Sequence, residues 1–407
     1  MLADADELLP RAEAVRRVTS LRTAFGGADA STGTESVSLE AIDGRTLADP
    51  VVATDDHPPT DIATMDGFAV RTADGSPRSL RSGEVFPEDD PPDLGPGEAM
   101  RVATGAPLPR GADAVVKRED ATVTGETVDT PPVPAGTDVY GRGSNVAAGE
   151  TLFSAGERLT PKDAILLRDL GVEPVTVRRR RSVGVLATGT EIDEGRQADL
   201  DSPMLCGLVR AWGADPHFAG AVPDEAGRVE DEIASLAADH DVVVTSGGTS
   251  VGHKDHVVRA LDTLGEVLFH GVEVRPGKPI AVARLPDHEA VAFAIPGKPL
   301  GALTVATLVA RPFFVGDDPL PTTAAEMAVD LELGPPPFEY AVPVVLEDGT
   351  AVPMGHTTSP LPLDERTFDA SVVSQSTRAT RADGFLVTGS PLAAGQSVDV
   401  VPYTVVQ

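Results

Sequence analysis

Apolar residues follow different patterns along this chain, and the clearest pattern lies in residues 182–314. There, short apolar runs alternate with stretches in which apolar residues recur every three or four positions. The first pattern is typical of strands and the second of amphipathic helices, so their alternation predicts a three-layer α/β domain. We expect its central strand to be Val242–Val244, a β-branched run without a polar face that is buried on both sides.

The same patterns predict the other elements of this domain. Further strands are expected at residues 183–187 and 217–222 and near Val267, Ile280 and Val291. Helices are expected at residues 204–212, on the face formed by Val229, Ile233 and Leu236, at residues 257–264 and from Leu300 onward.

The rest of the chain has shorter elements. Residues 53–140 combine proline, glycine and aspartate with short apolar runs, which is typical of a β-rich domain. Helices are expected on both sides of it, one at residues 12–21 and one that begins at Thr160-Pro161 and ends at Gly171. The second helix should bury a stripe of Ile165, Leu166 and Leu170. We expect the two helices to pack together, which makes the β-rich segment an insertion.

These patterns predict a multidomain α/β protein with four parts. They are a mixed helical N-terminal domain (1–50 and 143–179), a β-rich inserted domain (51–142), a three-layer α/β domain (180–318) and a small C-terminal β domain (319–407). Four consecutive arginines, Arg178–Arg181, precede the α/β domain. A basic docking patch is one interpretation of this run, and we favour a solvated linker.

Charge and composition exclude several classes of function. The 407 residues carry a formal net charge of −30, with a pI near 4.5, so the chain lacks the basic surface that sequence-independent nucleic-acid binding requires. Such acidity with few lysines is typical of a surface adapted to molar salt. The single cysteine, Cys206, excludes an intrachain disulfide and suits a reducing cytoplasm. We expect neither a signal peptide nor a membrane-spanning segment.

The few lysines indicate where the chemistry lies. Only five occur, and Lys254, Lys278 and Lys298 lie in glycine-containing loops that follow strand-like apolar runs. In an open α/β sheet the ligand crevice lies at such strand ends. The Gly247-Gly248 pair after the central strand lets backbone N–H groups approach an anion, although a tight structural turn is the alternative interpretation. Together the loops predict a site for an anionic ligand.

Several segments resemble motifs of one family, the MoeA and gephyrin E-domain proteins, which are molybdopterin molybdenumtransferases. The resemblance covers nearly the whole chain, and the motifs occur in the family's order with consistent spacing. The matching segments are Thr-Met-Asp-Gly-Phe-Ala-Val-Arg at 64–71, Arg-Val-Ala-Thr-Gly-Ala-Pro and the residues that follow it at 101–116, Ala-Thr-Gly-Thr-Glu at 187–191, Ser-Gly-Gly-Thr-Ser-Val-Gly-His-Lys-Asp at 246–255, and Arg-Pro-Gly-Lys-Pro at 275–279.

This resemblance implies a fold and a reaction. The α/β domain would be Mog-like, and the chain would form an elongated homodimer in which each active site is built by two chains. The family inserts molybdate into adenylylated molybdopterin and releases AMP, with a divalent cation such as Mg²⁺. Loop amides and lysines suit the phosphates and the molybdate, and carboxylates suit the cation.

The resemblance also assigns residues to roles. Catalytic roles fall to Asp66, Thr104, Asp255 and Lys278, with Asp66 and Thr104 contributed by the partner chain, and Mg²⁺ would be bound by Glu191 and Asp255. Two alternatives remain open, because Asp66-Gly67 is also an ordinary turn pair and Asp255 could cap the helix that follows. The substrate-binding residues would be Thr188, Gly189, Ser246, Gly247, Gly248, Ser250, Gly252, Arg275, Gly277, Pro296, Gly297 and Lys298.

The chain departs from the family pattern at several positions. An acidic Gly-Glu-Asp segment that usually follows Asn145-Val146 is absent, and the Pro-Gly-Asn-Pro-Val-Ser loop reads Pro-Gly-Lys-Pro-Leu-Gly at residues 296–301. An Asp-Ser-Asn motif reads Asp-Ser-Pro at residues 201–203, and an arginine of the C-terminal domain is replaced near Tyr340. An alternative function therefore stays open, that of a non-catalytic paralogue that binds molybdopterin nucleotide as a carrier or scaffold.

Overall fold

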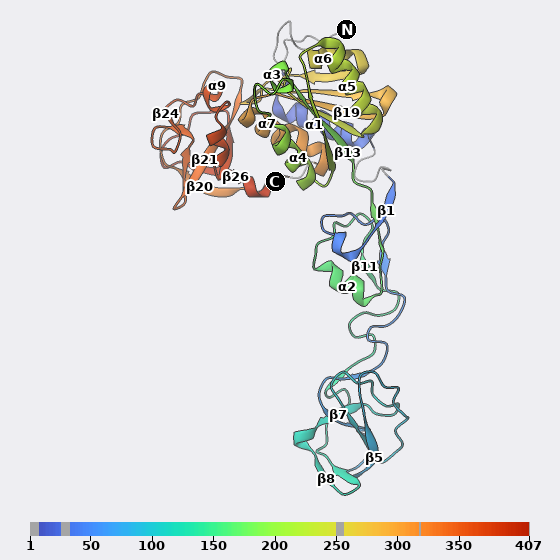
Figure 1. The fold of residues 1–407 in the computed structure, drawn as a ribbon. Coiled ribbons are helices and arrows are strands. Elements are labelled where there is room, and N and C mark those ends of the chain that lie inside the picture. Colours follow the sequence, from blue (N-terminus) through green and yellow to red (C-terminus); the bar gives the residue numbers. More distant parts are fainter. Residues whose placement is uncertain (1–7, 26–32, 250–255, 317–318, 407) are drawn as a thin grey trace. The chain divides into compact units, whose positions relative to one another are not determined.

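The structure is a computed structural model that describes residues 8–25, 33–249, 256–316 and 319–406. The chain divides into two compact units. One contains residues 1–34 and 178–407, and the other contains residues 35–177. Figure 1 shows the helices and strands of both. The finer division into four domains stays a prediction.

A six-stranded sheet forms the centre of the first unit, in the order β14-β13-β15-β19-β18-β16. The first four strands in this order are parallel to their neighbours, and β18 and β16 are antiparallel additions at one edge. The strands are β13 (Ser182–Thr188), β14 (Asp215–Val222), β15 (Val242–Ser246), β16 (Glu266–His270), β18 (Ala281–Leu285) and β19 (Ala290–Ile295). This arrangement confirms the predicted strands and puts the carboxyl ends of four parallel strands side by side.

Helices cover both faces of this sheet, which makes the domain three-layered. Along the central strand, Val242 and Val244 belong to one core and Val243 to the other, so the strand is buried on both sides as predicted. One face is covered by α5 (Ala226–Asp239) and α6 (His256–Leu264). The other face is covered by α1 (Arg11–Ala24), α4 (Ser202–Ala211), α7 (Pro299–Val305) and α8 (Arg311–Val315), and a π-helical turn (Ala306–Ala310) joins α7 to α8. The short α3 (Thr190–Asp193) follows β13.

The position of α1 corrects one prediction. We expected this helix to pack against the segment that contains Gly171, but its buried residues Ala14, Val18 and Leu21 join the core of the α/β domain, and α1 packs against α8. The apolar face of a helix identifies which side is buried and does not identify its partner. The expectation of a solvated linker was also wrong for Arg181, whose guanidinium lies 5.3 Å from the centroid of the Phe313 ring.

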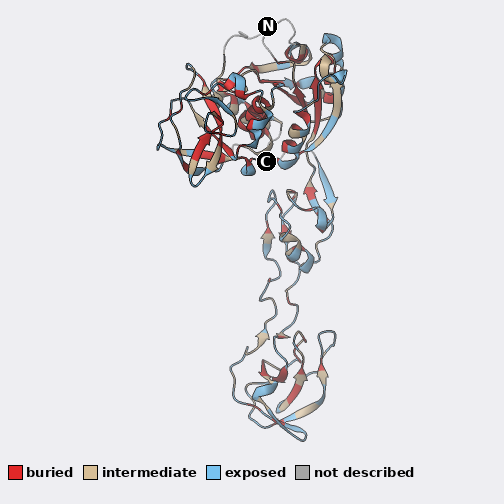
Figure 2. Ribbon diagram, turned by 60° about the vertical axis from the view of Figure 1, so that its left-hand side comes forward, coloured by how far each residue is buried: buried red, intermediate tan, exposed pale blue. Residues whose placement is uncertain are grey.

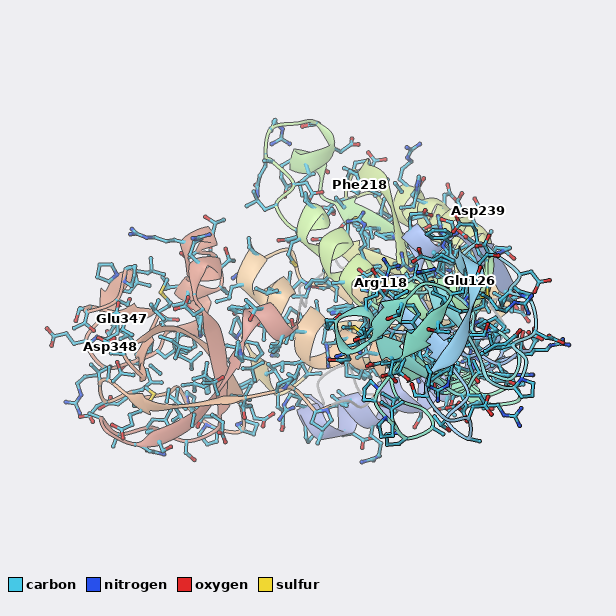
Figure 3. The ribbon with its side chains drawn as sticks, turned by 90° about the horizontal axis from the view of Figure 1, so that it is seen from below. Arg118, Glu126, Phe218, Asp239, Glu347 and Asp348 are labelled. Atoms are coloured by element: carbon cyan, nitrogen blue, oxygen red, sulfur yellow. The ribbon has the colours of Figure 1, made fainter. Side chains whose placement is uncertain are left out.

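The C-terminal part of the first unit is a closed β structure. Its strands pair in the order β17-β21-β22-β20-β26-β25, and an additional pairing of β21 with β25 closes the ring. The turn between β21 and β22, with Glu347 and Asp348, lies at its outer edge (Figure 3). The strands are β17 (Val274–Arg275), β20 (Thr323–Met327), β21 (Glu339–Glu347), β22 (Thr350–Pro353), β25 (Gly384–Thr388) and β26 (Ser397–Pro402), and the other elements are β23 (Gly355–His356), β24 (Pro362–Asp364) and α9 (Ala370–Val373).

Two contacts tie this β structure to the α/β domain. Strand β17 follows β16 in the chain, yet it pairs with β21 in parallel, Val274 opposite Glu339. At the end of the chain, a 3₁₀ turn (Tyr403–Val405) leads to Val406, whose carbonyl accepts a hydrogen bond of 3.0 Å from the indole Nε1 of Trp212. The two parts therefore share one apolar core, seen as the buried interior in Figure 2.

The second unit contains a six-stranded sheet with the order β7-β4-β6-β5-β9-β8. Its strands are β4 (Gly67–Val70), β5 (Arg78–Val85), β6 (Glu98–Val102), β7 (Ala114–Lys117), β8 (Thr122–Thr124) and β9 (Thr127–Asp129). Three two-stranded pairs complete the unit: β1 (Thr34–Val37) with β12 (Val175–Arg178), β2 (Val51–Val52) with β11 (Thr151–Phe153), and β3 (Ile62–Ala63) with β10 (Val139–Tyr140). Residues between Leu39 and Val51 share a core with residues between Phe153 and Val177.

Helix α2 (Asp163–Asp169) lies in this last core and differs from the prediction in two ways. It begins later than the Thr160-Pro161 pair suggested, because the backbone amides of residues 163–165 bond to the carbonyls three residues earlier, not four. Its fully buried residue is Leu167, whereas Ile165 is 76 % exposed. Gly171 has a φ of +69° after the helix, where a glycine was expected. None of the described helices is both long enough and apolar enough to cross a membrane.

Candidate functional site

A cavity of about 670 Å³ lies where the parallel strands of the α/β sheet end. Thr188 at the end of β13, Ser246 at the end of β15 and Pro296 just after β19 all contribute to its wall. Open α/β sheets bind ligands at this edge, because the loops that follow the strands diverge there. The volume is in the range of cavities that hold nucleotide-sized ligands.

Most of the predicted substrate-binding residues line this one cavity. They are Thr188, Ser246, Gly247, Gly248, Arg275, Gly277, Pro296, Gly297 and Lys298, together with Lys278 and the predicted Mg²⁺ ligand Glu191. Gly189 lies between two lining residues and does not line the cavity itself. The remaining predicted residues of the glycine loop, Ser250, Gly252 and Asp255, lie outside the described residues, as does Lys254.

Glycines are required where the loops of the cavity meet. A Cβ atom at Gly297 would be 3.1 Å from the Cα of Gly247, so the two loops touch through their backbones. Gly277 has a φ of +116°, and a Cβ atom there would be 2.3 Å from Cγ1 of Val305 on α7. The glycines therefore hold three loops close together, with their backbone groups at the cavity.

Three cations line the cavity, Arg275, Lys278 and Lys298, and none forms an ion pair with another described residue. Neither Lys278 nor Lys298 forms a side-chain hydrogen bond or ion pair with any part of the chain that the structure describes. The guanidinium of Arg275 lies 3.9 Å from the centroid of the Phe338 ring. In a chain with 63 acidic and 33 basic residues, unpaired cations around one cavity favour an anionic ligand.

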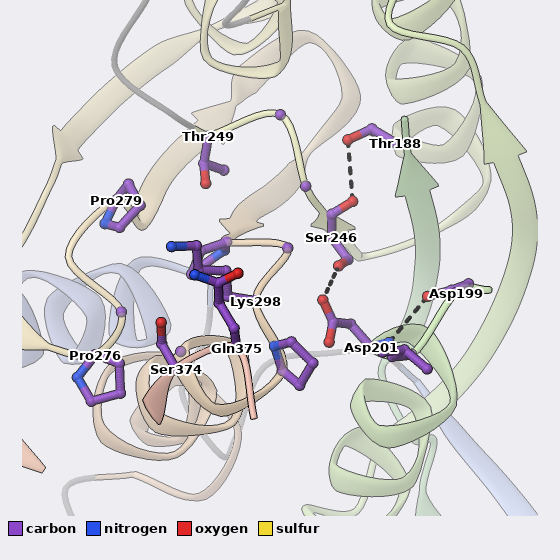
Figure 4. Close-up of a pocket in the computed structure, with 18 of the residues that line it drawn as sticks. Thr188, Asp199, Asp201, Ser246, Thr249, Pro276, Pro279, Lys298, Ser374 and Gln375 are labelled. Carbon is purple, nitrogen blue, oxygen red and sulfur yellow. Dashed lines mark hydrogen bonds between the residues drawn. The ribbon is translucent and has the colours of Figure 1, made fainter. Parts of the chain in front are cut away.

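The opposite side of the cavity carries carboxylates, among them Asp199 and Asp201 (Figure 4). Ser246 Oγ donates to Asp201 Oδ2 at 3.0 Å, and the amide of Asp201 donates to Asp199 Oδ1 at 3.1 Å. The other oxygens of both carboxylates are buried without a described partner. Burial raises the pKa of Asp201, and the hydrogen bond from Ser246 opposes this effect only in part. Donors on a ligand could satisfy these oxygens.

The C-terminal β structure also contributes to the cavity wall, through Ser371, Ser374 and Gln375 on and after α9. Asp369 caps this helix, because its Oδ1 accepts hydrogen bonds from the hydroxyl and amide of Ser371 and from the amide of Val372. The Ser371 hydroxyl is the main reason that the pKa of Asp369 lies below its ordinary value. The cap therefore fixes the short helix α9, whose Ser371 lines the same cavity as the cations.

Sequence reasoning missed several of these lining residues. Asp199 and Asp224 belong to the α/β domain, and a carboxylate after a strand or before a helix was the available signal for them. Asp201 was noted within the Asp-Ser-Pro segment at residues 201–203 but was given no role. Ser374 and Gln375 come from a part of the chain that lacks any local motif, so only the tertiary fold places them in the cavity.

Two predicted catalytic residues lie in the other unit and contact each other. The backbone amide of Thr104 donates to Asp66 Oδ1 at 2.7 Å, and the Thr104 hydroxyl donates to the same oxygen at 2.8 Å. These two bonds, the amide first, lower the pKa of Asp66, and the charge of Arg118 acts in the same direction. The carboxylate is exposed and held ionised, with Oδ2 left for another partner.

The sequence matches known proteins along most of its length. Residues 9–171 match the family described as "MoeA N-terminal region (domain I and II)", and residues 184–315 match "Probable molybdopterin binding domain". The chain is 32 % identical over 305 residues to the molybdopterin molybdenumtransferase of Synechococcus elongatus, covering 69 % of this chain and 75 % of that protein. The chain belongs to the molybdopterin molybdenumtransferase family. The predicted family is therefore confirmed.

Other members of the molybdopterin molybdenumtransferase family support the same conclusion. The enzyme of Nostoc is 35 % identical over 294 residues, covering 68 % of this chain and 67 % of that protein. The crystal structure of the molybdopterin biosynthesis MoeA protein from Pyrococcus horikosii matches with a TM-score of 0.79 and 29 % identity, over 98 % of this chain and 99 % of that chain. The predicted fold class, a multidomain α/β protein with a Mog-like domain, is thus confirmed as well.

Proposed function

We propose that this chain, which acts in molybdenum cofactor biosynthesis as a molybdopterin molybdenumtransferase, inserts molybdate into adenylylated molybdopterin and releases AMP. The observation that supports this reaction most directly is the set of unpaired cations, Arg275, Lys278 and Lys298, around a cavity large enough for a nucleotide. Both substrates are anions, one through its phosphates and the other as an oxyanion, so both are suited to bind these three cations.

The residues of the cavity have complementary tasks in this proposal. Lysine ammonium groups supply positive charge to the phosphates and the oxyanion, and the glycine loops at 247–248 and 277 bring backbone N–H groups within reach. Asp199 and Asp201 face the part of the ligand that carries N–H donors. The hydroxyls of Ser371 and Ser374 extend the polar wall to the C-terminal β structure.

Carboxylates in the wall suit the divalent cation that the family implies. Among the described residues no cluster of three or more His, Cys, Asp or Glu side chains forms a complete metal cage. Mg²⁺ is usually held by one or two carboxylates and completed by phosphate oxygens, which is the donor set available here. Glu191 and Asp255 would hold the ion, and it would neutralise charge on the phosphates.

Further parts of the proposal concern the assembly and its surroundings. We propose a homodimer in which Asp66 and Thr104 of one chain serve the cavity of the other, with no nucleic acid or membrane as partner. We propose a cytoplasmic protein adapted to molar salt, because acidic residues outnumber basic ones by 30. Thr104 donates two hydrogen bonds to Asp66 Oδ1, which supports a role in which Oδ2 of the same carboxylate binds a ligand.

The test is a turnover assay in molar KCl with Mg²⁺, in which AMP released from adenylylated molybdopterin is measured with and without molybdate. We expect repeated turnovers that require molybdate. The variant Lys278→Gln should lose about tenfold or more in kcat/KM, since it removes a charge from the cavity. Lys162→Gln, which neutralises an exposed lysine in the other unit, is the matched control and should behave like wild type.

One alternative is tested by the same assay. A carrier or scaffold would bind the nucleotide and release no AMP. The replacement of the loop hydroxyl by Gly301, which lines the cavity, is the observation that favours it. Tight nucleotide binding without molybdate-dependent release would support the carrier and refute the transferase reaction.

A further inference from the structure

Arg275 is held in an unusual way for a cation in so acidic a protein. Its guanidinium lies 3.9 Å from the centroid of the Phe338 ring, which is close enough for face-to-face contact. Phe338 itself is 9 % exposed and belongs to the core of the first unit. The guanidinium therefore has one face covered by a fixed aromatic ring.

The backbone determines this contact. Arg275 ends β17, and Phe338 immediately precedes β21, the strand with which β17 pairs. The register of this parallel pair puts Val274 opposite Glu339 and Arg275 opposite Tyr340. The cation thus ends one strand and the aromatic ring lies one residue before the strand paired with it, so the register of this pair determines their mutual position.

The donors of the guanidinium remain available. No ion pair and no side-chain hydrogen bond of Arg275 exists among the described residues, although it lines the cavity. The charge of Arg275 contributes to lowering the pKa of Asp369, and Oδ1 of that carboxylate already accepts three hydrogen bonds at the start of α9. A carboxylate bound to Arg275 would occupy its N–H groups, whereas a ring against its face leaves them all free.

We propose that Phe338 is a positioning residue that holds the guanidinium of Arg275 flat, so that its N–H edge binds a tetrahedral oxyanion in the cavity through two parallel hydrogen bonds. A guanidinium fixed by stacking loses less side-chain entropy when it binds than a free one, and its planar donors match two oxygens of a phosphate or a molybdate. That these two anions are the candidates rests on the proposed function.

The position of Phe338 offers a matched control. Phe338→Leu keeps an apolar side chain in the core and removes the aromatic face, and Phe338→Tyr keeps that face. Phe368 is also buried in the same core, and its ring packs edge to face on Tyr340. Phe368→Leu therefore makes the same change in the same core, at a ring that has no cation over its face among the described residues.

The experiment measures binding of molybdate and of inorganic phosphate to the full chain by calorimetry, and the KM for molybdate in the AMP assay. We expect Phe338→Leu to weaken one of the two anions about 2- to 30-fold, the factor that a cation–π contact supports. Phe338→Tyr should remain close to wild type, and Phe368→Leu should leave both anions unaffected. In an Arg275→Gln background, Phe338→Leu should cause no further loss.

The two anions distinguish the possible ligands. A loss confined to molybdate assigns Arg275 to the oxyanion substrate, and a loss confined to phosphate assigns it to the nucleotide. Equal losses in Phe338→Leu and Phe368→Leu would overturn the proposal, and so would a full Phe338→Leu effect in the Arg275→Gln background or no binding of either anion by wild type. Absence of AMP release with intact, Phe338-dependent anion binding would refute the proposed reaction and leave this inference standing.

Discussion

Substitution of Gly277 by alanine should distort the cavity, because the added methyl group has no space there. The φ of +116° at Gly277 is strained for any residue with a Cβ atom, which costs about 1–3 kcal/mol. The new Cβ atom would also be 2.3 Å from Val305 Cγ1 and 3.0 Å from the carbonyl oxygen of Gly301, and overpacking of this kind costs about 1–3 kcal/mol. We expect Gly277→Ala to lower the free energy of unfolding by about 2–6 kcal/mol and to displace Lys278 beside it.

Gly301→Ala is the matched control. Its Cβ atom would meet nothing closer than the amide nitrogen of Gly277, at 3.5 Å, and it lies within α7, where alanine is favoured over glycine by about 0.5–1 kcal/mol. Urea unfolding followed by the fluorescence of Trp212, the single tryptophan, reports on the first unit. Phosphate binding by calorimetry reports on the cavity. Equal stability and equal anion affinity of the two variants would refute the claim that close packing of the loops requires glycine at 277.

Two further predictions concern titratable groups. Burial raises the pKa of Asp201, so ionisation of this carboxyl group destabilises the folded state once the pH exceeds the pKa of an ordinary aspartate. Asp201→Asn should therefore stabilise the protein at neutral pH by on the order of 1 kcal/mol and weaken nucleotide binding. A less stable variant with full nucleotide binding would contradict this prediction. Burial and the nearby His217 lower the pKa of His240, so protonation favours the unfolded state and the free energy of unfolding should fall as the pH drops from about 8 to about 5. His240→Gln should flatten that dependence in urea titrations, and an unchanged slope would remove His240 as its source.

The sequence predicted those features that depend on local pattern. The strand and helix periods of residues 182–314 were strong, because each element there buries a regular set of side chains, and glycine loops with lysines identified three of the loops around the cavity. The spacing of apolar residues in a helix predicts which face is buried but not what that face packs against. For this reason α1 was expected to pack against the helix that ends at Gly171, whereas it joins the core of the α/β domain. Ile165 was assigned to a buried stripe because a helix of seven residues carries too little periodicity to fix its inner face.

The pattern of residues along the sequence could not predict contacts between segments that are far apart in the chain. Ser374 and Gln375 enter the cavity because a β structure more than one hundred residues further along the chain than Ser246 closes against it. The arginine run was read from its charge alone, but Arg181 packs on Phe313, since a guanidinium can cover an aromatic ring as well as face water. In each case the tertiary partner, not the residue type, determined the outcome.

The hydrogen bond from Trp212 to Val406 has a consequence for how the protein is made. The first unit draws its core from residues as far apart as Ala14 and Val406, whereas the second unit is the continuous segment 35–177. During synthesis the ribosome can release all of the second unit while most of the first is still untranslated, and domains generally fold as they emerge. The second unit can therefore fold first, and the core that supports the candidate cavity can be completed only after Val406 has left the ribosome.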